Sequence, residues 1–176
     1  MTKLLGLCGS LRAASASAAV ARALAENLAP RATLEMARIG DLPHYNADID
    51  GGAPVARLIA QIEAADGLVF VTPEYNYSVP GVLKNAIDWA SRPAYQSVFK
   101  HKPSLVITVS GGALGGARAQ SHLKYILNGM LADTHVGQEI LVPHANHKVE
   151  DGRFSDAATL DFALAEIESF IGALRA

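Results

Sequence analysis

A chain of 176 residues, 50% hydrophobic and 18% charged, is long enough to bury a full core and too apolar to be disordered. Its net charge of −2 and the lack of a basic run argue against a nucleic-acid partner or a membrane surface. The single cysteine, Cys8, excludes an intramolecular disulfide framework, and its place in an apolar run favours a packed structural residue over a redox thiol. No segment has the pattern of a signal peptide or a bilayer span, so we expect a cytoplasmic protein.

The first half of the chain alternates short apolar runs with stretches of helical spacing, which is the pattern of βα units. In chain order it predicts a buried strand at Lys3–Cys8, a helix at Ser15–Leu28 and a second strand at Thr33–Arg38. A polar stretch then leads to a helix with the apolar stripe Val55, Leu58, Ile59 and Ile62. The run Gly67–Thr72 is apolar on both faces, as a central parallel strand must be, and is the third predicted strand.

The second half of the chain continues the alternation. A helix is predicted to open with Pro80, whose missing N–H costs nothing in a first turn, and to end before Pro93. A fourth strand is expected at Ser104–Val109, and a glycine-rich loop then leads to a helix with Leu123, Ile126, Leu127 and Met130. The pattern closes with a fifth strand at His135–Val142 and a helix at Ala157–Leu174.

Five strands that alternate with five helices predict an α/β fold, a doubly wound five-stranded parallel sheet with helices on both faces. Right-handed crossovers favour the flavodoxin-like strand order 2-1-3-4-5. Because no linker, repeat or low-complexity segment interrupts the pattern, residues 1–176 are expected to form one domain. Ligands of such sheets bind at the carboxyl ends of the strands, where the loops after the first, third and fourth strands converge.

The loop after the first strand, Gly9–Ser17, has the composition of an anion site. It ends at a helix N-terminus, where unpaired backbone N–H groups and the helix dipole attract a phosphate. A serine N-cap explains one serine, but three serines and an arginine exceed what a cap needs. The loop lacks the motifs of a P-loop and of a dinucleotide fold, which leaves a mononucleotide phosphate. The candidate ligands are Ser10, Arg12, Ser15, Ala16 and Ser17.

The loop after the third strand is both aromatic and polar. Its backbone groups can bond the pyrimidine edge of a flavin while a tyrosine shields one face, but a tyrosine-rich turn closed by Pro80-Gly81 explains the same residues equally well. Trp89 in the following helix is expected to pack in the core rather than to touch a cofactor. The candidate ring contacts in this loop are Pro73, Glu74, Tyr75, Asn76, Tyr77 and Ser78.

The loop after the fourth strand, Ser110–Arg118, is rich in glycine, which lets backbone approach a flat ligand closely. Backbone N–H groups and a helix N-terminus aimed at the pyrimidine side of a flavin would stabilise the negative charge that builds there on reduction. A flexible connection is the alternative, but it accounts for one or two glycines and not for all of them. Ser110 and Gly111 are the candidate contacts, and Arg118 is a candidate partner for the extra phosphate of NADPH.

Three motifs together resemble a known family. Gly9-Ser10-Leu11-Arg12-x-x-Ser15, the run Thr72–Gly81 with Leu83–Trp89, and Gly115-Gly116-Ala117-Arg118 strongly resemble the NADPH-dependent FMN reductases. The similarity is nearest to their chromate and quinone reductase branch, which is related to azoreductases, and it covers essentially the whole chain. Ser17 stands where many members carry asparagine.

The resemblance implies a cofactor and a division of labour among the candidate residues. FMN is the cofactor and NADPH or NADH the co-substrate. Ser10, Arg12, Ser15 and Ser17 hold the FMN phosphate, the loop 73–78 holds the ring and the ribityl chain, and Ser110 and Gly111 close over the ring. The resemblance also implies a homodimer or homotetramer.

We therefore hypothesise a ping-pong oxidoreductase in which NAD(P)H gives a hydride to flavin N5 and leaves, after which a quinone, a metal oxyanion such as chromate, or another small-molecule acceptor takes two electrons. No side chain needs to act as an acid or base, because the cofactor carries the chemistry.

Other classes of function fit the sequence less well. The main alternative is a flavodoxin-like electron carrier or regulatory partner without turnover, but such carriers tend to be strongly acidic and this chain is nearly neutral. A serine hydrolase is excluded because no G-x-S-x-G elbow follows a strand. The segment His144-Ala145-Asn146-His147 with Glu150 suggests a metal site, but it follows the other motifs at a distance, and we expect surface histidines and no metal.

Overall fold

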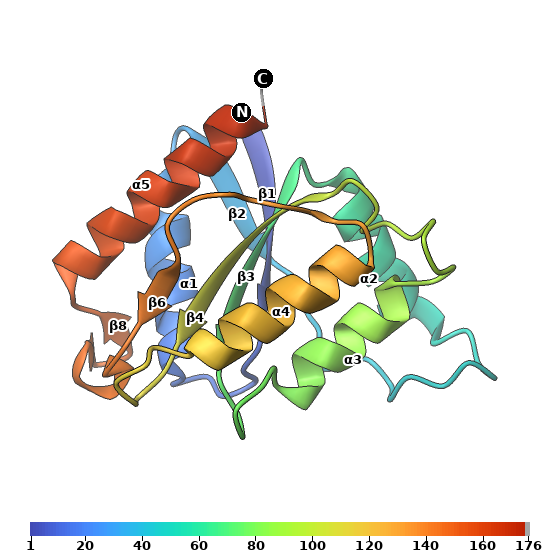
Figure 1. The fold of residues 1–176 in the computed structure, drawn as a ribbon, viewed down its shortest axis with the longest axis horizontal. Helices are drawn as coiled ribbons and strands as arrows, with labels where there is room; N and C mark the ends of the chain where they lie inside the picture. The colour runs from blue at the N-terminus through green and yellow to red at the C-terminus, as the bar shows by residue number, and fades with distance from the viewer. Residues whose placement is uncertain (175–176) are drawn as a thin grey trace.

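The computed structural model describes residues 1–174, in which helices lie on both faces of one central sheet (Figure 1). The strands of the sheet are β1 (Thr2–Cys8), β2 (Ala32–Met36), β3 (Gly67–Pro73), β4 (Pro103–Val109), β5 (Asp133–Thr134) and β6 (Ile140–Val142). The helices are α1 (Ala16–Leu28), α2 (Gly52–Ala64), α3 (Gly81–Ala90), α4 (Ala117–Gly129) and α5 (Ala157–Ala173). A 3-10 turn η1 (Ala145–His147) and a hairpin of β7 (Val149–Glu150) and β8 (Arg153–Phe154) precede α5.

The sheet has the predicted order, β2-β1-β3-β4-β5, and its strand pairs are parallel, which confirms the doubly wound α/β fold. Strand β3 lies between β1 and β4, and its residues from Gly67 to Thr72 are all buried. This burial on both faces is what the unbroken apolar run of β3 requires.

The predicted fifth strand, His135–Val142, is wrong as a single element. Two short strands replace it: β5 pairs with the start of β4 and β6 with its end, and residues 135–139 leave the sheet between them. Gly137, Gln138 and Glu139 are exposed, so a strand through them would bury polar groups against the helices. The detour is held to α5, because Glu166 accepts the backbone N–H of Gln138 at 3.1 Å.

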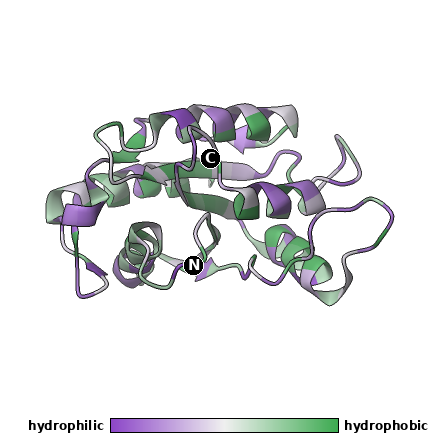
Figure 2. Cartoon of the chain, turned by 90° about the horizontal axis from the view of Figure 1, so that it is seen from below, coloured by the Kyte–Doolittle hydropathy of each residue, from purple (hydrophilic) through white to green (hydrophobic). Residues whose placement is uncertain are grey.

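Alternate strand residues supply two hydrophobic cores, one on each face of the sheet. In β1, Leu4 packs toward α1 and α5, whereas Leu5 and Leu7 pack toward α2, α3 and α4. Figure 2 shows the helices on both sides of the sheet. None of the helices within residues 1–174 has the length and apolar character needed to cross a bilayer.

Several element boundaries differ from the prediction by a few residues. Pro80 caps α3 instead of opening it, and Leu174 caps α5. The hairpin of β7 and β8 is not in the predicted set, although its turn, Asp151-Gly152, has positive φ angles of 48° and 76° and a sequence typical of tight hairpins. The Asp151-Gly152 dipeptide could therefore have predicted the hairpin.

The polar stretch before α2 is tied to α3 by Trp89. The indole Nε1 of Trp89 donates a hydrogen bond to the carbonyl of Pro43 at 2.8 Å, and its ring packs edge-on against Tyr45. Asn85 donates to the same carbonyl at 2.9 Å and accepts from the backbone N–H of Tyr45 at 2.7 Å. Trp89 is 6% exposed, so the prediction that it serves packing is confirmed.

Cys8 ends β1 as a partly buried thiol. Burial raises the pKa of the Cys8 thiol above its usual value, with smaller opposing effects from a backbone hydrogen bond at Ser10 and from the charge of Arg22. A raised pKa disfavours the reactive thiolate, in agreement with the predicted structural role.

Candidate functional site

The loops that follow β1, β3 and β4 meet at one edge of the sheet and enclose a cavity of about 140 Å³. Of the predicted site residues, the three at the turn of the second loop, Asn76, Tyr77 and Ser78, lie outside its lining. Of the lining residues, Val109, Ala145 and Asn146 are not in the predicted set. The full lining is Ser10, Arg12, Ser15, Ala16, Ser17, Pro73, Glu74, Tyr75, Val109, Ser110, Gly111, Ala145 and Asn146.

A larger hollow, of about 760 Å³, lies at the start of β1 and is lined by Met1, Lys3 and Glu35 among others. None of the three loops reaches it. We assign the site to the smaller cavity because hydrogen-bond donors and the N-terminus of α1 converge there. Volume alone does not identify a binding site.

The N-terminus of α1 is open toward the cavity. Ser15 is the N-cap: its Oγ accepts the backbone N–H of Ala18 at 3.0 Å. Within the described residues, no protein group accepts the backbone N–H of Ala16 or Ser17. Ser15 is therefore an N-cap that satisfies one donor and leaves two beside the positive end of the helix, and its part in an anion site stays a prediction.

Arg12 adds a full positive charge to this end of the cavity. Its side chain is exposed and forms no ion pair with a described residue. Ser10 is 8% exposed, and its Oγ accepts the backbone N–H of Arg12 at 3.4 Å. Unpaired backbone donors and an unpaired guanidinium form a donor set that fits a phosphate.

The loop after β3 is a tight hairpin. Tyr75 and Ser78 exchange two backbone hydrogen bonds of 3.0 Å, and Asn76 and Tyr77 between them have positive φ angles of 49° and 68°. Both central residues of such a turn need the left-handed region, which asparagine tolerates better than tyrosine. The turn brings the Tyr75 hydroxyl to 3.5 Å from the Oγ of Ser10, so the first and second loops touch across the cavity.

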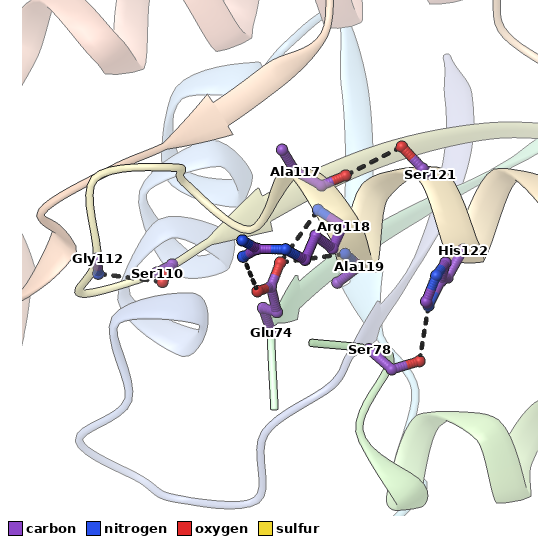
Figure 3. A network of polar contacts seen from close by, with 9 residues as sticks. All are labelled: Glu74, Ser78, Ser110, Gly112, Ala117, Arg118, Ala119, Ser121 and His122. Atoms are coloured by element: carbon purple, nitrogen blue, oxygen red, sulfur yellow. Dashed lines mark hydrogen bonds and ion pairs between the residues drawn. The ribbon is translucent and has the colours of Figure 1, made fainter. Parts of the chain in front are cut away.

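Glu74 joins this hairpin to the first turn of α4 (Figure 3). Its Oε2 accepts the backbone N–H groups of Arg118 at 3.1 Å and of Ala119 at 3.2 Å, and its Oε1 accepts from Nη1 of Arg118 at 3.2 Å. The backbone N–H of Ala117 donates to the carbonyl of Leu114 at 3.1 Å. The expectation that the α4 N-terminus is aimed at a ligand is therefore wrong, because the protein's own groups satisfy these donors.

Two further contacts hold the tip of the hairpin against α4. The guanidinium of Arg118 lies 4.4 Å from the ring centroid of Tyr77. Figure 3 shows the second contact, in which Ser78 Oγ lies 3.0 Å from Nδ1 of His122. Arg118, the predicted partner of a NADPH phosphate, is thus already engaged with Glu74 and Tyr77. Tyr77 remains 67% exposed at the rim of the site.

The glycines of the third loop serve close packing as well as the cavity. Gly116 precedes α4 with φ of 86°, and a Cβ there would lie 2.9 Å from Cβ of Thr108 in β4. A Cβ on Gly111 would lie 2.6 Å from Nδ2 of Asn146. Glycine at 116 therefore lets α4 approach β4 this closely, whereas a larger residue at 111 would displace the Asn146 side chain.

The turn η1 contributes Ala145 and Asn146 to the cavity lining. It is held there by backbone hydrogen bonds from Ala145 to the carbonyl of Ser110, at 2.9 Å, and from His144 to that of Gly112, at 3.1 Å. This segment was expected to lie apart from the other motifs. Since it follows β6, which runs parallel to β4, it reaches the same edge of the sheet, and that rule could have identified it. The histidines are exposed as expected, and residues 1–174 hold no cluster of metal ligands.

Comparisons with known proteins identify the family of the chain. The model of the NADPH-dependent FMN reductase family matches residues 2–147. The chain is 43% identical over 160 residues to an NAD(P)H-dependent FMN reductase of Pseudomonas aeruginosa, covering 88% of this chain and 85% of that protein. It is 44% identical over 173 residues to a quinone reductase of Escherichia coli K12, covering 93% and 90%.

The fold has solved counterparts. The flavoenzyme NAD(P)H:(acceptor) oxidoreductase FerB of Paracoccus denitrificans superposes with a TM-score of 0.88 at 36% identity, over 99% of this chain and 98% of that chain. An FMN-dependent NADH-azoreductase of Bacillus anthracis, solved with FMN, shares the fold with a TM-score of 0.60 at 17% identity, over 99% of each chain.

Proposed function

The chain belongs to the NADPH-dependent FMN reductase family, and on that premise we propose that it is an FMN-dependent NAD(P)H oxidoreductase that reduces quinones. The observation that carries the proposal is the open N-terminus of α1, where the N–H groups of Ala16 and Ser17 and the charge of Arg12 have no partner among residues 1–174. That donor set matches the terminal phosphate of FMN.

The residues of this chain bind and orient the cofactor in three groups. Arg12 and the start of α1 would hold the phosphate, Pro73 and Tyr75 would contact the ribityl chain and the ring, and Ser110, Gly111 and Asn146 would line the opposite side. FMN, when bound, would supply the redox chemistry of hydride transfer from NAD(P)H and two-electron transfer to the acceptor. Accordingly, no side chain is assigned a catalytic proton transfer, and the exposed rim at Tyr77 leaves room for NAD(P)H and acceptor to use one face in turn.

The experiment begins with the absorption spectrum of the purified protein, before and after addition of FMN. Stopped-flow mixing of the FMN-loaded protein with NADPH or NADH should bleach the flavin absorption, and added quinone should restore it. A protein that takes up no FMN, or one whose flavin neither nucleotide bleaches, would overturn the proposal. An electron carrier without turnover would bind FMN but fail to oxidise NADPH steadily with a quinone.

Wider properties complete the proposal. Metal oxyanions such as chromate are proposed as further two-electron acceptors, to be tested by NADPH oxidation with chromate. Residues 1–176 are proposed to act as one FMN-binding domain in the cytoplasm, and to assemble as a homodimer or homotetramer, as the family resemblance implies. Tyr77 in the second loop and Tyr125 on α4 are 67% and 80% exposed, which supports a subunit contact, and light scattering of the eluted protein measures the assembly.

A further inference from the structure

Glu74 lines the cavity, yet its carboxylate is bonded to α4 (Figure 3). The side chain is only 13% exposed, and both of its oxygens accept hydrogen bonds from the first turn of α4 or from the side chain of Arg118. Arg118, in contrast, is 45% exposed. A negative charge is therefore fixed in the cavity lining, and its partners are the first turn of α4 and the side chain of Arg118.

The negative charge of Glu74 opposes two positive charges beside it. The N-terminus of a helix acts like about half a positive charge, and the Arg118 guanidinium adds a full one. Both would favour negative charge at the ring end of the cavity, where Ser110 and Gly111 also lie. The carboxylate of Glu74 cancels much of this field, and a buried charge is screened less by solvent than the exposed guanidinium is.

We propose that Glu74 is a positioning residue that sets the charge balance at the ring end of the cavity: it holds Arg118 and the start of α4 in place and neutralises their positive field. This inference rests on the proposed function, because it concerns FMN bound in this cavity. Charge near the flavin ring tunes its electron affinity, so the neutralised helix end keeps the midpoint potential low and favours passage of electrons to an acceptor. The Glu74–Arg118 pair is thus a control on potential rather than a contact that holds FMN.

Opposite changes at the two partners distinguish this role from simple structural support. Glu74→Gln keeps an oxygen acceptor for the α4 N–H groups but removes the charge, so the midpoint potential should rise. Arg118→Ala removes the counter-charge and should lower it, by less, because Arg118 is exposed. Arg118→Lys keeps the charge and should restore the parental potential. For Glu74→Gln we expect reduced flavin to be favoured on the order of tenfold more, which is about 30 mV for a two-electron couple.

The matched control is Glu168→Gln, which removes the same charge from an ion pair with Arg31, on α5 and away from the three loops. Its potential should equal that of the parent. The midpoint potential of each FMN-loaded variant is measured by redox titration of the flavin absorption, and thermal unfolding of each apoprotein reports on structural damage.

The outcomes separate this inference from the proposed function. Potentials that shift in the same direction in Glu74→Gln and Arg118→Ala, or a Glu74→Gln potential equal to that of Glu168→Gln, would overturn the inference. If Glu74→Gln fails to fold or to load FMN, the Arg118 pair decides, and an Arg118→Ala potential at or above that of Arg118→Lys overturns it. A parent protein that binds no FMN would instead overturn the proposed function.

Discussion

The N-termini of α1 and α4 lie at the same edge of the sheet and have opposite states. At α1 a short neutral side chain, Ser15, satisfies one backbone donor and leaves those of Ala16 and Ser17 facing the cavity. At α4 a carboxylate from another loop, Glu74, satisfies two donors and brings a negative charge of its own. A helix end is thus an anion site only when the protein leaves its donors free, and the helix alone does not decide this.

The largest effect should come from making α1 resemble α4. Ser15→Asp keeps a good N-cap but places a carboxylate beside the phosphate site. Two unit charges about 5 Å apart repel by about 3 kcal/mol at an effective dielectric constant of about 20, so FMN affinity should fall at least about 100-fold. Quenching of FMN fluorescence on binding measures it. The control, Ser15→Asn, caps without charge, and equal affinities for the two variants would contradict the open-end interpretation.

Removal of the exposed charge of Arg12 from the N-terminus of α1 should have the next largest effect. Arg12→Ala should weaken FMN binding by about 30-fold, because a hydrogen bond to a charged group contributes about 2 kcal/mol. The unfolding midpoint of the apoprotein should stay unchanged, since the Arg12 side chain bonds to no described residue. Arg12→Lys should recover most of the affinity in the same binding assay. An apoprotein destabilised by Arg12→Ala would show that the arginine has a structural role instead.

The N-terminus of α4 should affect the stability of the protein, whereas the N-terminus of α1 affects FMN binding. Glu74→Ala leaves the α4 donors of Arg118 and Ala119 without a protein acceptor, so the unfolding free energy of the apoprotein should fall by about 1–2 kcal/mol. Urea denaturation measures this change. Ser15→Ala, the matched loss of a cap at α1, should cost about 1 kcal/mol. A neutral Glu74→Ala would mean that α4 does not depend on this carboxylate.

Asn146 tests the far wall of the cavity. Asn146→Ala should reduce FMN affinity about fivefold, since a neutral hydrogen bond contributes about 1 kcal/mol. His147→Ala, at an exposed neighbour outside the cavity lining, is the control and should leave the affinity unchanged. Equal losses in the two variants would point to a general disturbance of η1.

A third helix end gives the smallest predicted effect. Asp156 caps α5, and the hydrogen bond from Lys148, followed by those from Thr159, lowers the pKa of Asp156 to about 2 from 3.8. Because the folded pKa is depressed, the stabilising contribution is present above about pH 4 and is lost as the pH falls through about 2. Lys148→Ala should raise the pKa of Asp156 toward 3.8 in an NMR titration. An unchanged pKa would show that Thr159 alone holds the carboxylate.

The fold was predictable from the sequence because its signals are local. Unbroken apolar runs such as Gly67–Thr72 mark strands buried on both faces, and the alternation with helices restricts the order of the sheet. The fifth strand was not predictable in the same way, because the polar residues 137–139 divide it and only contacts with α5 decide where the chain leaves the sheet.

The site also has features that local sequence predicts and features that depend on contacts between distant residues. Arg12, the Ser15 cap and the free backbone donors of α1 lie within six residues of one another, so composition predicted the open end of α1. Glu74 and Arg118 are 44 residues apart in the sequence, and Asn146 and Gly111 are 35 residues apart. No local pattern therefore showed that Glu74 bonds the start of α4 or that Asn146 completes the cavity. For the second loop, a flavin contact and a tyrosine-rich turn explain the residues equally well, and the family resemblance alone favours the flavin contact.

The bond between Trp89 and Pro43 makes the protein its own reporter. The chain has a single tryptophan, and in a domain of this length, with a radius of gyration of about 16 Å, we expect it to lie close enough to a bound flavin for energy transfer. Indole emission should therefore dim as the cofactor is loaded and shift to longer wavelength as the Pro43 contact breaks. One unlabelled signal thus follows both occupancy of the site and release of the loop before α2, without any change to the sequence.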